Sequence, residues 1–236
     1  MKLAFSTLGC PDWSFNEIFS TAKDLGFDGV EIRGVGNELY APSIPQFGPE
    51  KVGKTLEKLQ RLGVEYIRIL GDDKACPSVP VKDDDVKSEI IKIAGMAEEK
   101  GVTLLLETNG VYSDTARAAA LVISIGSDSV AVLWDVHHPI RYNSEPPERS
   151  FENFVGLIRY IHIKDSINES GEIKYRMMGF GDMPIKEILA LLRQNGYDGY
   201  ISLEWVKRWC AELEAPGVVF MQYISYMRKA LGSNKQ

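Results

Sequence analysis

Three apolar runs in the middle of the chain each carry, at or near the end, a side chain that can bind a metal or move a proton. VTLLLE ends at Glu107, VAVLWD ends at Asp135, and YIHIKD carries His162. A fourth run of the same kind, YISLE, ends later in the chain at Glu204. Short runs that are apolar throughout are typical of parallel strands buried on both faces. We therefore expect buried strands whose carboxyl ends carry polar side chains.

Helical patterns separate these runs, and a glycine marks the junction between each helix and the next strand. The junctions read LGFDGVEI, LGVEYIRI, KGVTLLLE and NGYDGYISLE. Glycine at a helix end followed by a β-rich run is the usual chemistry of such a junction. An extra short strand expected near Lys174–Met178 completes the eight strands of a barrel. The pattern predicts one α/β domain over residues 1–236, a (β/α)8 TIM barrel.

An open doubly wound sheet is the alternative architecture. Such a sheet usually carries a glycine-rich phosphate turn after its first strand. Here the corresponding turn reads TLGCPD and has one glycine. The length of 236 residues is also close to the roughly 250 that are typical of an eight-stranded barrel. Both observations favour the barrel.

The composition argues against several kinds of partner. The net charge of −6 disfavours an extended nucleic-acid backbone, which usually meets a basic surface. The three cysteines form no CxxC pair, which indicates reduced thiols and a cytoplasmic location. The amino-terminal apolar run is cut by Pro11, and no apolar stretch approaches the roughly 20 residues of a membrane span. We expect neither a nucleic-acid partner nor membrane association.

The four polar strand ends predict a metal site. In an eight-stranded barrel, side chains at the carboxyl ends of the strands converge on one cavity. Carboxylates buried together without a cation raise one another's pKa, so a bound cation explains them at low cost. Carboxylates with one imidazole suit a divalent ion such as Mn, Co, Zn, Fe or Mg. Each residue alone could be a loop cap, an ion-pair partner or a polar core residue. The predicted ligands are Glu107, Asp135, His162 and Glu204.

Two more residues are candidates for substrate binding. Strand periodicity places Lys164 on the same face as His162, where it could hold a substrate oxygen. An ion pair of Lys164 with Asp165 or another carboxylate is the alternative. His138 follows Asp135 by three positions, beyond the strand end, where it could meet a substrate hydroxyl. Arginines are further candidates for phosphate recognition, with structural ion pairs as the alternative. These arginines are Arg33, Arg68 and Arg176.

The chain resembles the sugar phosphate isomerase/epimerase family with the xylose isomerase-like TIM barrel. The matching phrases span nearly the whole chain: LGFDGVEI, LLLETN, WDVHH, YIHIKDS, GFGDMPIKEIL and NGYDGYISLEW. The resemblance implies one divalent metal ion and a small carbohydrate substrate, and barrels of this group often form homo-oligomers. It implies that the metal is held by Glu107, Asp135, His162 and Glu204.

The resemblance also implies roles in catalysis. His138 would contact the substrate, and Glu107 and Glu204 would act as acid–base groups on opposite faces of the sugar. The expected reaction is isomerisation or epimerisation of a sugar, keto-sugar or sugar phosphate, by proton transfer through an enediolate. The segment KDSINESG has no arginine where the epimerase branch carries one. A dehydratase or lyase that uses the same metal on a keto-polyol is the alternative.

A DNA-repair nuclease similar to endonuclease IV is a third hypothesis. The resemblance implies that such a nuclease uses three zinc ions and more histidines. This chain has His137, His138 and His162, and none at the second and third strand ends. We therefore rank the nuclease below the sugar enzymes.

Overall fold

The computed structural model describes residues 1–39, 65–72 and 81–232. Its contacts group the chain into two compact units. The first unit comprises Met1–Gly63 and Ile163–Gln236, and the second comprises Val64–His162. The sequence also predicts a helix over Glu50–Leu62, which lies outside the described residues. The single domain over residues 1–236 stays a prediction.

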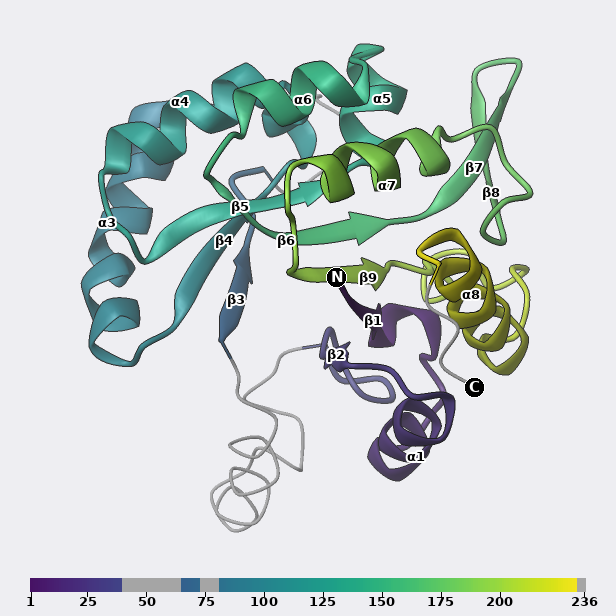
Figure 1. The fold of residues 1–236 in the computed structure, drawn as a ribbon. Coiled ribbons are helices and arrows are strands. Elements are labelled where there is room, and N and C mark those ends of the chain that lie inside the picture. The colour runs from purple at the N-terminus through teal and green to yellow at the C-terminus, as the bar shows by residue number, and fades with distance from the viewer. Residues whose placement is uncertain (40–64, 73–80, 233–236) are drawn as a thin grey trace, which may run out of the picture. The chain divides into compact units, whose positions relative to one another are not determined.

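Strands alternate with helices along both units (Figure 1). The elements of the first unit are β1 (Lys2–Ser6), η1 (Thr7–Gly9), α1 (Phe15–Leu25), β2 (Gly29–Glu31), β7 (Asp165–Glu169), β8 (Glu172–Arg176), α7 (Ile185–Gln194), β9 (Tyr200–Leu203) and α8 (Pro216–Ala230). The elements of the second unit are β3 (Tyr66–Ile69), α3 (Asp83–Glu99), β4 (Thr103–Glu107), η4 (Gly110–Ser113), α4 (Thr115–Ile125), β5 (Val130–Asp135), α5 (His137–Asn143), α6 (Pro147–Asn153) and β6 (Ile158–Ile163), whose last residue belongs to the first unit. Among the helices of the described ranges, none is long and apolar enough to cross a membrane.

The long strands pair in parallel, as the sequence predicts. In the first unit β1 lies between β2 and β9. In the second unit β4 pairs with β3 and β5, and β5 pairs with β6. Every residue of β5 is buried, and so are four of the five residues of β4. Figure 1 shows α3 and α4 side by side next to these strands, which explains why the strands are apolar on both faces.

The segment after β6 differs from the prediction. The strand expected near Lys174–Met178 is β8, and it pairs antiparallel with β7 instead of joining the parallel strands. The hairpin turns at Ser170 and Gly171, which have φ values of 55° and 90°. Two consecutive positive φ values belong to the tight turns that join antiparallel strands. The expectation of a barrel strand here is therefore wrong.

Local capping signals in the sequence define several helix ends. The sequence predicts a capping box at Ser14 and Glu17, and the two residues form it at the start of α1; Gly26 ends that helix with a φ of 69°. Asp114 caps α4 by accepting a hydrogen bond from the backbone N–H of Arg117. The sequence also predicts Asp182 as the cap of a helix that starts at Pro184, but α7 begins at Ile185 with Pro184 as its N-cap, so this prediction is wrong.

One carboxylate ties the amino end of α3 to its neighbours in the second unit. Arg117 of α4 donates from Nε to both oxygens of Asp83, at 3.0 and 3.1 Å. The hydroxyl of Tyr112 donates to Oδ1 of Asp83 at 2.8 Å. These bonds to the charged form, led by that from Arg117, hold the pKa of Asp83 below its usual value. The ion pair is nevertheless partly open to solvent, because the Asp83 side chain is 44% exposed.

We expect Asp83→Asn to lower the free energy of unfolding at neutral pH by roughly 0.5–1 kcal/mol, a range suited to a solvent-screened pair. Asp84→Asn is the matched control, since it removes a neighbouring charge from the same helix turn. A lowered pKa stabilises the fold above the usual aspartate pKa, and this contribution disappears as the pH falls through the folded-state pKa. Urea unfolding of both variants at neutral and acid pH measures this difference in the free energy of unfolding. A difference that persists in acid would contradict the assignment to Asp83.

Candidate active site

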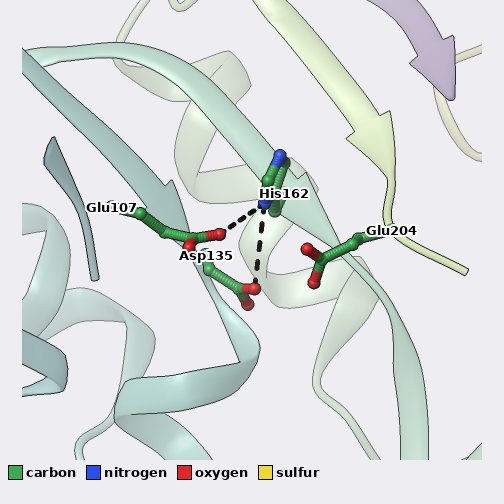
Figure 2. Close-up of side chains that lie close together, drawn as sticks. All are labelled: Glu107, Asp135, His162 and Glu204. Carbon is green, nitrogen blue, oxygen red and sulfur yellow. Dashed lines mark hydrogen bonds and ion pairs between the residues drawn. The ribbon is translucent and has the colours of Figure 1, made fainter. Parts of the chain in front are cut away.

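Three predicted ligands come together in the second unit. Glu107 and Asp135 are the last residues of β4 and β5, and His162 lies near the end of β6. Parallel register pairs Asp135 directly with His162. All three residues are fully buried, and each offers a ligand atom within 4.8 Å of the others. Figure 2 shows the three side chains facing one another; it also draws Glu204, a residue of the first unit.

The donor set fits a divalent cation. Nδ1 of His162 lies 2.7 Å from Oε1 of Glu107 and 3.9 Å from Oδ2 of Asp135. Two buried carboxylates converge on one imidazole nitrogen, an arrangement that a bound cation would stabilise. Two oxygens and one nitrogen are ligands that Zn, Mn, Co and Fe accept. This buried group could therefore bind a metal.

Thr108 joins the two carboxylate-bearing strand ends. Its hydroxyl accepts a hydrogen bond from the N–H of Asp135 at 2.8 Å and donates to the carbonyl of the same residue at 3.0 Å. Oδ1 of Asp135 accepts from the backbone N–H of His137 at 2.9 Å. The backbone of His137 thus orients a predicted ligand. The only signal for Thr108 in the sequence is its place directly after Glu107 in the phrase LLLETN.

His138 presents one ring nitrogen to the same centre. Its Nδ1 lies 2.8 Å from the carbonyl oxygen of Thr108. A carbonyl can only accept, so Nδ1 carries the proton, and in the neutral ring Nε2 is the acceptor. Nε2 lies 3.6 Å from Oδ2 of Asp135. This tautomer leaves Nε2 as the ring atom suited to meet a substrate hydroxyl.

Glu204 lies in the first unit, directly after β9, and two cationic side chains hold it. Nη1 of Arg33 donates to Oε1, and Nζ of Lys164 donates to Oε2. Both Glu204 and Lys164 are buried. Of the two interpretations of Lys164 from the sequence, the structure shows an ion pair with a carboxylate, and that carboxylate is Glu204. The backbone N–H of Glu204 donates to the carbonyl of Ile163 at 3.0 Å.

Asp165 binds main-chain N–H groups of the loop before α7. Its Oδ2 accepts from the backbone N–H groups of Gly179 and Gly181, at 2.8 and 2.9 Å. Its Oδ1 accepts from the N–H groups of Ser166 and Met183, at 2.8 and 3.3 Å. Four main-chain donors on one buried carboxylate fix the path of the loop before α7. The sequence reasoning had treated Asp165 only as a partner for lysine.

One buried cysteine is excluded as a nucleophile. Cys10 follows η1 and is 2% exposed. Burial raises the pKa of its thiol to about 12. Because the thiolate is the reactive form, Cys10 remains an inert thiol near neutral pH.

Comparisons with known proteins agree with the fold. The sequence model of one family, described as xylose isomerase-like TIM barrel, matches residues 50–229. A fructoselysine 3-epimerase of Escherichia coli O157:H7 is 24% identical, and the match covers 90% of this chain and 93% of that protein. A solved structure of IolI with a bound zinc atom superposes with a TM-score of 0.74 at 17% identity and covers 98% of each chain. The structure of AsbF, a probable 3-DHS dehydratase from Bacillus anthracis, has a TM-score of 0.74 at 15% identity and covers both chains fully.

Proposed function

Because the chain belongs to the xylose isomerase-like TIM-barrel family, we propose that it is a metal-dependent epimerase or isomerase of a sugar, keto-sugar or sugar phosphate. Its relatives support an isomerase or epimerase enzyme and a small carbohydrate substrate. The observation that carries the proposal is the buried convergence of Glu107, Asp135 and His162. A cytoplasmic location, a homo-oligomer and the absence of a nucleic-acid partner stay predictions.

The proposed metal ligands are Glu107, Asp135, His162 and Glu204. The first three support the proposal by their mutual distances. Glu204 is supported by its backbone hydrogen bond to Ile163, the residue that directly follows His162. A divalent ion held there would polarise the substrate carbonyl and stabilise negative charge on its oxygen. The donor set would suit Mn, Co, Zn, Mg or Fe.

The protein's own groups would move the protons. In the proposed epimerisation, one of Glu107 and Glu204 removes the proton next to the carbonyl, which gives an enediolate. The other returns a proton to the opposite face of the same carbon. Nε2 of His138 would accept a hydrogen bond from a substrate hydroxyl, and Lys164 would hold a substrate oxygen. In an isomerisation the proton returns to the neighbouring carbon instead.

A dehydratase or lyase on a keto-polyol is the second candidate. It is favoured by the structural likeness to AsbF, a probable dehydratase, over the full length of both chains. Such an enzyme would use the same proton abstraction and then expel water from the adjacent carbon. Loss of one water from the product separates it from an isomerase or epimerase.

Hydrogen exchange tests the proposal directly. The metal-loaded protein is incubated in heavy water with ketoses, their phosphates and epimer pairs such as D-fructose and D-psicose. We expect deuterium at the carbon next to the carbonyl in at least one substrate, together with conversion to its epimer or isomer. Loss of water without conversion would support the dehydratase instead. If no substrate of the panel exchanges a proton, the proposed function is wrong.

A further inference from the structure

Arg68 holds one oxygen of Glu107. It lies in β3, and the parallel register pairs it with Leu105 of the neighbouring strand β4. Nη2 of Arg68 donates to Oε2 of Glu107. The other oxygen, Oε1, faces Nδ1 of His162 at 2.7 Å. The carboxylate therefore presents one oxygen to the guanidinium and the other to the predicted ligand group.

Arg33 holds one oxygen of Glu204 in the same manner. It follows β2 by two residues, and its backbone N–H donates to the hydroxyl oxygen of Thr7 at 2.8 Å. The hydroxyl of Thr7 in turn donates to the carbonyl of Gly34 at 2.7 Å. Nη1 of Arg33 then donates to Oε1 of Glu204, and Lys164 donates to Oε2. The base of this arginine is thus tied down, and its far end fixes the carboxylate.

An arginine fixes the direction of a carboxylate better than a lysine does. A guanidinium is planar and carries its donors in a rigid fork, whereas an ammonium is a compact charge on a flexible stem. The direction of a carboxylate matters for proton transfer, since a misplacement of about 1 Å can reduce a rate by roughly 100-fold. Both glutamates with a proposed acid–base role have such an arginine. Neither arginine is explained by metal binding alone.

We propose that Arg68 and Arg33 are positioning residues, one for each of the two proton-transferring glutamates. Arg68 sets the direction of Glu107, and Arg33 sets the direction of Glu204. This inference rests on the proposed function in its epimerase form, because only that reaction needs a separate group on each face of the carbon. It assigns the two arginines to opposite faces of the reacting carbon rather than to phosphate recognition.

A first experiment uses cobalt as a spectroscopic probe and needs no substrate. Arg68→Met and Arg33→Met remove the donors and keep a long side chain, and the corresponding lysine variants keep the charge. We expect each methionine variant to bind one Co(II) per chain but to shift its visible absorption bands, and the lysine variants to shift them less. Arg117→Met is the matched control, because it breaks the ion pair with Asp83 and should leave the bands unchanged. Unchanged bands in both methionine variants would overturn the inference.

A second experiment compares deuterium exchange from each of the two epimers, because each glutamate removes the proton from a different epimer. With an epimer pair that the wild type interconverts, each methionine variant should lose at least about 10-fold in conversion. The loss must be equal in both directions, because the equilibrium between the epimers is fixed. Exchange of deuterium without conversion should persist from one epimer in Arg68→Met and from the other epimer in Arg33→Met. A purely structural role would reduce exchange from both epimers alike.

The outcomes distinguish this inference from the proposed function. If both methionine variants show the same exchange pattern, or if neither loses conversion, the arginines are not separate positioning residues. If the wild type acts on no epimer pair, the proposed function fails, and the Co(II) bands alone decide the role of the arginines. Arg117→Met should change stability without changing the exchange pattern.

Discussion

Glu204→Gln is expected to reduce epimer conversion by roughly 10²–10⁴-fold, the usual contribution of a positioned acid–base group. The amide keeps the size of the side chain, but it neither accepts a proton from carbon nor returns one. The variant should still exchange deuterium into one epimer, the one whose proton Glu107 removes, although it no longer converts that epimer into the other. Conversion rates and deuterium incorporation from each epimer, with the metal content measured in parallel, check this result. Conversion at the wild-type rate would exclude Glu204 from the proton transfer.

The same variant also disturbs a buried ion pair. Lys164 is 1% exposed and its ion pair with Glu204 is lost, and breaking a buried pair on one side can cost several kcal/mol. The double variant Glu204→Gln with Lys164→Met is therefore the control for folding, because it removes both members of the pair. Circular dichroism and thermal unfolding of both proteins separate lost catalysis from lost structure.

Asp135→Asn is expected to weaken divalent-metal binding by at least about 100-fold. Replacing a residue that only hydrogen-bonds to a metal ligand already lowers metal affinity by about 10–100-fold. The wild type should bind one ion per chain, and three zinc ions would favour the nuclease. Asp135 is fully buried and lies 3.9 Å from Nδ1 of His162, so a neutral amide removes a charge that nothing from solvent replaces. Elemental analysis and titration with Co(II) measure stoichiometry and affinity.

Asp128→Asn is the matched control for metal binding. Asp128 is an exposed aspartate that precedes β5, the strand whose last residue is Asp135. The control removes one negative charge near the opposite end of the same strand. Equal metal binding by wild type and Asp135→Asn would show that the ion, if bound, lies elsewhere.

The strands and their polar ends could be predicted from the sequence because the signals are local. A run such as VAVLWD is buried on both faces, and strand periodicity together with parallel pairing brings Asp135 and His162 to the same edge. The helix ends at Ser14 and Gly26 could likewise be predicted from capping residues alone. The family resemblance was confirmed by the match over residues 50–229.

The hairpin of β7 and β8 differs from the prediction because an eight-stranded barrel requires the strand near Lys174–Met178 to join the parallel strands. The phrase ESGE holds the turn residues Ser170 and Gly171, and a Ser-Gly pair between two short polar runs could have indicated a hairpin. The partners of Arg33 and Arg68 could not be predicted in this way. Arg33 and Glu204 are far apart in the sequence, so only tertiary structure decides which carboxylate each arginine meets.

The carboxylate of Asp165 has a further consequence for how the loop before α7 can change in evolution. It holds the loop before α7 through four main-chain N–H groups, so the loop's path does not depend on the side chains that the loop carries. Two glycines are exceptions: a Cβ at Gly181 would approach Oδ1 of Asp165 to 2.1 Å, and Gly179 has a φ of 85° that favours glycine. Phe180 between them is 66% exposed and free of these restrictions. Descendants of this sequence can therefore exchange the residue at position 180 while the backbone around it is inherited unchanged.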